Sequence, residues 1–176
     1  SFLLREKTLW AEAGHEVAFG QYVYQVEGSP EAPACGVELV RSLHNIGVRG
    51  ENFEVLFSVL NGGLVSYKYA GREMIEAIPK PNFWRAPTDN DCGSLMQMRY
   101  AQWKIASMYA SHKDYRKGMY GPANAPETTV HENSVEVAFT YILPTTPASE
   151  CRLAYEVTGD GRVKTTLTYD PVKELG

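Results

Sequence analysis

Hydrophobic and polar residues alternate with the two-residue period of β-strands over much of this chain. Two stretches place large apolar side chains at every second position: Phe53, Val55, Phe57 and Val59, and Val135, Val137, Phe139 and Tyr141. In the second stretch the positions between them include Glu136 and Thr140. This pattern predicts strands that turn one face toward a core.

Glycine-containing turn sequences separate the strand-like segments at Asn61-Gly62-Gly63, Ala70-Gly71-Arg72 and Gly159-Asp160-Gly161. Such sequences favour tight hairpin turns, which join antiparallel strands. The expected strands cover residues 2–4, 16–26, 43–49, 53–60, 64–69, 73–78, 128–132, 134–143, 153–158 and 162–169. The predicted fold class is therefore all-β, an antiparallel sandwich or part of one.

One segment predicts a helix instead. Leu95, Met98 and Ile105 recur at helical spacing within residues 94–108, and Ser94 stands where it can cap the first turn. The preceding residues 79–93 contain three prolines, which exclude a central strand and a helix interior. We expect one short helix in an otherwise β-rich protein.

Residues 28–36 are rich in Pro, Gly and Ala and are expected to form a linker between two domains. The chain begins without Met, carries no signal peptide pattern and stops soon after a strand-like segment. These features suggest a piece of a larger protein. A native chain from which a tag was removed is the alternative.

The composition of the chain argues against nucleic-acid binding, a membrane-spanning helix and a disulfide scaffold. The chain has 17 basic and 21 acidic residues, a net charge of −4, which gives no electrostatic footprint for nucleic acid. No apolar run reaches the roughly 18 residues of a membrane helix. Three cysteines are too few for a disulfide scaffold, and their odd number suggests a reducing compartment. A cytoplasmic location is expected, with the periplasm as the alternative.

Polar chemistry is concentrated in the run from Arg85 to Asp91, which contains Asp89, Asn90 and Asp91. Arg85 can clamp one of the two carboxylates bidentately. A calcium loop starting at Asp89 would need a carboxylate at its twelfth position, where Tyr100 stands. Two carboxylates can hydrolyse glycosides, but nothing apolar near these two would raise a pKa for acid catalysis. We therefore expect no catalytic and no metal-binding residue in this chain.

The stretch NFWRAPTDNDCG, residues 82–93, resembles the signature of the small-chain domain of the large β-galactosidases of glycoside hydrolase family 2. This domain is the C-terminal domain 5 of those enzymes. Residues 8–24, TLWAEAGHEVAFGQYVY, are similar to the last strands of the immunoglobulin-like domain that precedes it. Both segments occur in the family's order.

The resemblance implies a partial supersandwich similar to galactose mutarotase. Residues 1–27 would be the tail of the immunoglobulin-like domain, 28–36 the linker, and 37–176 the N-terminal half of the small-chain domain. The parent enzyme would hydrolyse terminal non-reducing β-D-galactose residues, for example in lactose, with retention. Its catalytic glutamates would lie on a barrel outside this chain. Mg and Na ions would be bound elsewhere in the parent, which is expected to be a homo-oligomer.

The resemblance also implies a non-catalytic accessory role that borders and gates the substrate cleft. The residues expected at this border are Arg85, Asp89, Asn90, Asp91, Gly93 and Ser94. Gly93 is expected to be the pivot of a mobile stretch. The alternatives are a stand-alone carbohydrate-binding module and a structural β-sandwich that holds subunits together.

Overall fold

The computed structural model of the chain describes residues 1–24, 36–113 and 126–172. The chain divides into two compact units, Ser1–Glu31 and Ala32–Gly176. In the first unit, β1 (Phe2–Leu3) pairs antiparallel with β2 (Glu16–Ala18). Most of the linker expected at residues 28–36 lies outside the described residues.

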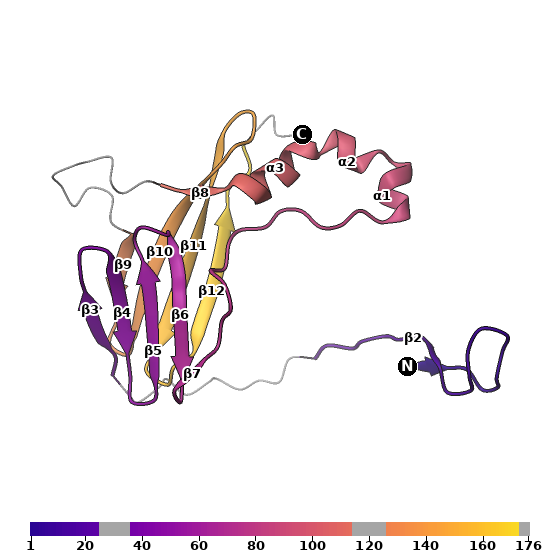
Figure 1. Cartoon of the computed structure of the whole chain (residues 1–176), viewed down its shortest axis with the longest axis horizontal. Helices are drawn as coiled ribbons and strands as arrows, with labels where there is room; N and C mark the ends of the chain where they lie inside the picture. Colours follow the sequence, from indigo (N-terminus) through magenta and orange to yellow (C-terminus); the bar gives the residue numbers. More distant parts are fainter. Residues whose placement is uncertain (25–35, 114–125, 173–176) are drawn as a thin grey trace. The chain divides into compact units, whose positions relative to one another are not determined.

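The second unit contains two five-stranded antiparallel sheets, which lie one behind the other in Figure 1. One sheet follows the chain order: β3 (Glu38–Arg41), β4 (Asn45–Arg49), β5 (Phe53–Ser58), β6 (Gly63–Tyr69) and β7 (Arg72–Glu73). The other sheet has the order β12-β11-β10-β8, with β9 also paired to β10. Its strands are β8 (Ser111–His112), β9 (Glu127–Val130), β10 (Ser134–Leu143), β11 (Ser149–Thr158) and β12 (Val163–Tyr169). The predicted antiparallel β-sandwich is confirmed.

The alternating residues of both sheets form the core. Phe57 of β5 is fully buried, and its ring lies 6.4 Å from the Phe139 ring and 5.4 Å from the Tyr155 ring of the other sheet. Burying one such side chain contributes roughly 1.5–3 kcal/mol. Ten large side chains are almost completely buried: Tyr141, Tyr155, Phe57, Phe139, Leu143, Val48, Val55, Val135, Val137 and Val157.

Hydrogen bonds connect the two sheets at both ends of the sandwich. The Tyr141 hydroxyl of β10 donates to the Gly62 carbonyl in the β5–β6 turn at 2.5 Å. At the opposite end, the Tyr67 hydroxyl of β6 donates to the Gly161 carbonyl in the β11–β12 turn at 2.6 Å. These bonds fix the hairpin turns of one sheet over the strands of the other.

Two strand predictions exceed the observed strands by several residues. The strand expected at 16–26 ends at Ala18, since β1, its partner among the described residues, has two residues. Residues 19–24 have no regular structure, and 25–26 lie outside the described ranges. The strand expected at 73–78 ends at Glu73. The Glu73 carboxylate accepts from the Ser66 hydroxyl at 2.6 Å and from the Tyr67 N–H at 2.8 Å, and both bonds lower its pKa. The N–H of Ile75 donates a third, longer bond to this carboxylate at 3.4 Å.

The connection from β7 to β8 contains three short helices where one was predicted: α1 (Asp89–Gly93), α2 (Met96–Arg99) and α3 (Ala101–Tyr109). Between the first two, Leu95 has a left-handed φ of 58°. We call residues 88–110 the helical arm; in Figure 1 its α1 end lies away from the sandwich. No helix among the described residues is long and apolar enough to cross a membrane.

Candidate functional site

The segment from Arg85 to Ser94 forms the start of the helical arm. Thr88 is the N-cap of α1, and its hydroxyl accepts from the Asp91 N–H at 3.4 Å. The Asp91 carboxylate reaches back and accepts from the Thr88 N–H at 2.7 Å and from its hydroxyl at 2.9 Å. This reciprocal arrangement is a capping box, which satisfies amide groups that the first helical turn leaves free.

Arg85 locks this cap from outside the helix. Its two terminal nitrogens contact the two Asp91 oxygens at 2.5 and 3.1 Å, the bidentate geometry that makes such pairs strong. Bonds from Arg85 first, and then from Thr88, lower the pKa of Asp91 from 3.8 to about 2. The predicted clamp is confirmed, and Asp91 rather than Asp89 is its carboxylate.

This geometry suits positioning better than acid catalysis. Asp91 is ionised at neutral pH and both its oxygens already accept hydrogen bonds, so it has no proton to donate to a leaving group. Asp89 and Asn90 are exposed, and their side chains have no hydrogen bond or ion pair within the described residues. These two side chains remain available to bind a group outside this part of the chain.

The structure corrects the expected roles of Ser94 and Gly93. Ser94 is the C-cap of α1 rather than the N-cap of a long helix, and its hydroxyl donates to the Asp91 carbonyl at 3.1 Å. Gly93 lies inside α1 and does not have a left-handed φ. Leu95, two residues later, takes that conformation. The conformational argument for a pivot at Gly93 is therefore wrong, because any residue can adopt the helical backbone found there.

An aromatic cluster attaches the arm to the sandwich. The rings of Phe83, Trp103 and Tyr169 lie 5.6–5.7 Å apart pairwise, within the usual range of aromatic pairs. The Phe83 N–H also donates to the Ser107 hydroxyl of α3 at 2.7 Å. The α3 end of the arm is thus tied to β12 and to the segment that contains Phe83.

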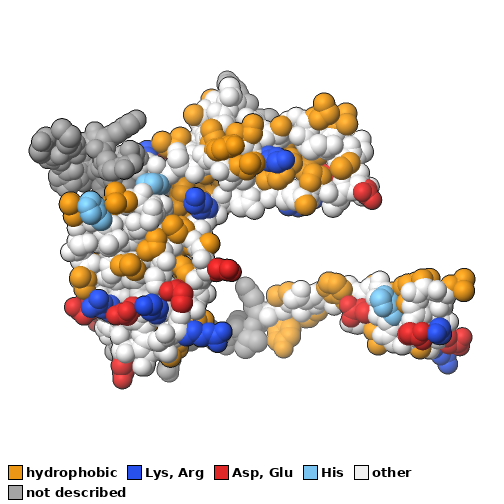
Figure 2. Space-filling model, viewed as in Figure 1, with side chains coloured by type: hydrophobic (Ala, Val, Ile, Leu, Met, Phe, Trp, Pro, Cys, Tyr) orange, Lys and Arg blue, Asp and Glu red, His pale blue; other side chains and the backbone are white. Residues whose placement is uncertain are grey.

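Several large apolar side chains of the helical arm are exposed to solvent. Figure 2 shows hydrophobic side chains spread over this part of the molecule. The large apolar residues at least two-fifths exposed are Leu95, Met98, Tyr100, Ile105, Met108 and Tyr109. Their concentration on one short segment is typical of a surface that contacts another protein part.

Thr88 and the aromatic cluster are the functional features that were not predicted from the sequence. Thr88-Asp-Asn-Asp91 matches the capping-box pattern of Thr followed three residues later by an acid, so a local signal for Thr88 existed. Phe83, Trp103 and Tyr169 come from segments far apart in sequence, and no local pattern joins them. Within the described ranges, no three His, Cys, Asp or Glu side chains are grouped so that they could hold a metal ion.

Comparison with known proteins identifies the family to which the chain belongs. Residues 49–176 match the model of the family described as "Beta galactosidase small chain". The match covers both sheets from the end of β4 onward and the whole helical arm. It therefore includes every residue of the Arg85–Ser94 segment.

Individual proteins that are similar to this chain support the same family. The chain is 34% identical over 177 residues to a β-galactosidase of Clostridium acetobutylicum, covering 99% of the chain and 18% of that protein. It is 40% identical to a β-galactosidase of Halalkalibacterium halodurans, covering 97% of the chain and 16% of that protein. A β-galactosidase small subunit of Latilactobacillus sakei is 30% identical over 133 residues, which are 70% of the chain and 42% of that subunit. The chain spans less than a fifth of the length of the first two relatives. On these matches, the chain belongs to the β-galactosidase small chain family.

Proposed function

We propose that this chain is an accessory part of a β-galactosidase that hydrolyses terminal non-reducing β-D-galactose residues, as in lactose. The observation that carries the proposal is the family match over residues 49–176, supported by β-galactosidases similar over nearly the whole chain. The catalytic carboxylates lie in other parts of the parent enzyme. Support for this division is the chemistry of the Arg85–Ser94 segment, whose one strongly perturbed carboxyl is held ionised.

The helical arm borders and gates the substrate cleft in this proposal. The Arg85–Asp91 pair and the capping box fix the backbone of α1, which presents Asp89 and Asn90 at a defined position. Preorganised polar groups position a ligand more effectively than groups on a loose loop. The exposed apolar side chains of the arm supply the contact with the domain that carries the barrel.

The finer domain assignment is also part of the proposal. Residues 1–27 are the tail of an immunoglobulin-like domain, 28–36 the linker, and 37–176 the N-terminal half of a mutarotase-like supersandwich of glycoside hydrolase family 2. The division into two compact units between Glu31 and Ala32 falls inside that linker and supports this assignment. The partners are other domains of the same enzyme and further copies of it in a cytoplasmic homo-oligomer. Mg and Na ions are bound elsewhere in the parent.

The test uses the parent enzyme and a chromogenic β-galactoside. Arg85→Lys keeps the charge but removes the bidentate geometry. Because small misplacements of positioning groups cost much activity, we expect kcat/KM to fall by about ten- to a hundredfold, with both kcat and KM changed. The matched control is Arg49→Lys, an exposed arginine whose ion pair with Glu54 lies at 3.5 Å on the sandwich. The control should leave both constants unchanged.

Two results would contradict the proposal. Unchanged kcat and KM in Arg85→Lys, with the protein folded, would show that the segment does not border the cleft. Steady hydrolysis of the same galactoside by the 176-residue chain alone would show that the catalytic groups lie within it.

A further inference from the structure

The turn between β5 and β6 contains the dipeptide Asn61-Gly62. In an Asn-Gly sequence the backbone nitrogen of glycine can attack the side-chain amide carbon of asparagine, because glycine has no Cβ that would hinder the approach. A C–N bond forms, and the amide nitrogen of the side chain leaves as ammonia with the proton of the attacking nitrogen. Water then opens the resulting succinimide ring to aspartate or isoaspartate. Asn61 therefore carries the chemistry of spontaneous deamidation.

The fold requires the glycine of this dipeptide. Gly62 has a φ of +67°, which residues with a Cβ rarely adopt. A Cβ built there would also fall 2.1 Å from the ring of His112, which lies on β8 in the other sheet. Asn61 is exposed, and its side chain has no hydrogen bond within the described residues. Packing thus fixes the residue that makes its neighbouring asparagine labile.

Hydrogen bonds hold the reacting nitrogen in place while the turn is closed. The Gly62 N–H donates to the Ser58 carbonyl at 2.9 Å, and the Asn61 N–H donates to the Ser58 hydroxyl at 3.1 Å. The hydroxyl of the buried Tyr141 donates to the Gly62 carbonyl at 2.5 Å, which ties the same glycine to the second sheet. A buried, hydrogen-bonded amide reacts only when its segment opens locally. The closed turn therefore shields Asn61 from its own glycine.

We propose that Asn61 is a deamidation site protected by the closed β5–β6 turn, and that the Tyr141–Gly62 bond controls how often the turn opens. Opening frees the Gly62 nitrogen from Ser58 and lets it reach the Asn61 side chain. Isoaspartate adds a methylene group to the backbone, so the modified turn no longer matches the positions of Ser58 and Tyr141. Deamidation then keeps this end of the sandwich open, where β8 follows α3 of the helical arm.

The test follows deamidation of the full 176-residue chain in mildly alkaline buffer. Trypsin cuts after Arg49 and Lys68, and tandem mass spectrometry of the peptide 50–68 gives the deamidated fraction at Asn61. We expect the folded chain to react about tenfold or more slowly than the same chain in urea above its unfolding midpoint, because only the unfolded turn is always open.

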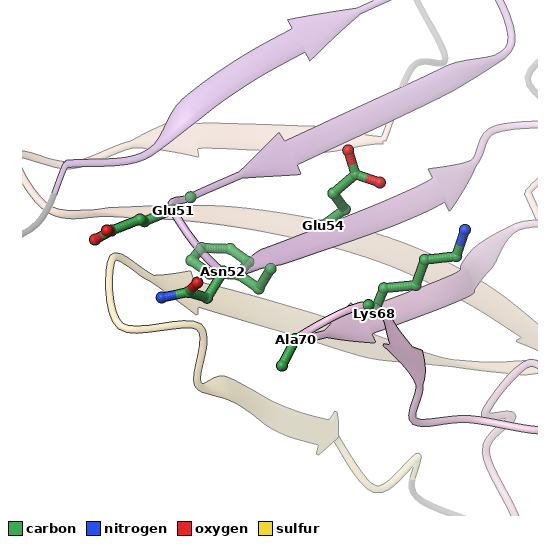
Figure 3. A pocket seen from close by; sticks show the side chains of 8 residues that line it. Glu51, Asn52, Glu54, Lys68 and Ala70 are labelled. Atoms are coloured by element: carbon green, nitrogen blue, oxygen red, sulfur yellow. The ribbon is translucent and has the colours of Figure 1, made fainter.

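Asn52 is the control within the same peptide. It is exposed, lies in the turn between β4 and β5 at the other end of β5, and lines a surface pocket (Figure 3). Its neighbour Phe53 has a Cβ, which hinders attack by the backbone nitrogen. We expect little deamidation of Asn52 in the folded or the unfolded chain.

Matched variants test the role of the tyrosine. Tyr141→Phe should accelerate deamidation of Asn61 in the folded chain about three- to tenfold, the range expected when one hydrogen bond is lost. Tyr67→Phe removes the corresponding bond to the Gly161 carbonyl at the opposite end of the sandwich and should leave the rate at Asn61 unchanged. If Tyr141→Phe does not fold, Ser58→Ala removes the hydroxyl that holds the Asn61 N–H and should also accelerate the reaction.

Three outcomes would overturn the proposal. Equal rates at Asn61 in the folded and unfolded chain would show that the closed turn gives no protection. An unchanged rate in folded Tyr141→Phe would show that its bond does not control opening. Equal acceleration in Tyr141→Phe and Tyr67→Phe would show that global unfolding, rather than this turn, controls the reaction. None of these bears on the proposed β-galactosidase role, because no galactoside is hydrolysed.

Discussion

Gly161 is a position where the fold should tolerate a methyl group poorly, for two separate reasons. It has a φ of +86°, which residues with a Cβ rarely adopt. In addition, a Cβ built there would lie 2.9 Å from both Phe53 and Tyr69. Gly161→Ala therefore combines backbone strain with overpacking between the sheets.

Gly71 separates these two effects. Its φ of +77° is similar, but a Cβ there would meet nothing within 4 Å. Gly71→Ala should cost about 1–2 kcal/mol, the left-handed backbone penalty alone. Gly161→Ala should cost about 1–3 kcal/mol more, since added methylenes in a packed core force neighbours to move. The total for Gly161→Ala is then about 2–5 kcal/mol.

Urea unfolding followed by tryptophan fluorescence measures both values. The unfolding midpoint should fall in the order wild type, Gly71→Ala, Gly161→Ala, with the slope m nearly unchanged. Equal losses in the two variants would refute the reasoning, because they would show that the rings of Phe53 and Tyr69 can move aside without cost. A loss in Gly71→Ala alone would show that the turn at Gly161 is not fixed between the sheets.

Two further predictions concern titratable groups. The folded-state pKa of Asp91 is depressed to about 2, so its contribution to stability is present above its ordinary pKa of 3.8 and is lost as the pH falls toward 2. Asp91→Asn should therefore flatten the decrease of the urea midpoint over this pH range, whereas Asp89→Asn, which removes no ion pair, should show a smaller change. Burial raises the pKa of the Cys151 thiol to about 11, while Cys92 is exposed. Iodoacetamide at pH 8 should alkylate Cys92 much faster than Cys151 in the folded chain, as peptide mass mapping would show, and equal rates would contradict the buried position.

Much of the sandwich could be predicted because its signals are local. The alternation in residues 53–59 and 134–143 gives strands of the expected faces, and the glycine turns at 61–63, 70–72 and 159–161 join antiparallel neighbours. Each of these features depends on a few consecutive residues. A strand that needs a distant partner is different: β8 pairs with β10 across a long connection, and no pattern in its two residues indicates this.

The helical arm was predicted less well for a related reason. Helical spacing of apolar residues indicates a helix but not where it breaks, and the left-handed Leu95 interrupts it. Ser94 is a good capping residue, but Thr88 with Asp91 and Arg85 forms a stronger start six residues earlier. The candidate segment itself was identified from its composition and its resemblance, and the ion pair was derived from charge alone. The aromatic cluster at the base of the arm could not be predicted from the sequence, because Tyr169 is far from Phe83 and Trp103 along the chain.

Locally unfavourable backbone and exposed apolar side chains are found in the helical arm of the second unit. This supports the proposal that the arm has the functional role and the sandwich the structural one. Natural proteins follow the rules of backbone propensity and apolar burial through most of the fold, and the exceptions are usually at functional or strained sites. In the two sheets, turns with positive φ mostly use glycine, and the large apolar residues of the core are buried. In the arm, Leu95 takes a left-handed backbone at a cost of about 1–2 kcal/mol, and six large apolar side chains are exposed. The aromatic cluster ties the α3 end of the arm to β12, and the burial of apolar side chains in the sandwich offsets this cost. The arm is thus the part of this unit whose conformation requires a function to explain it.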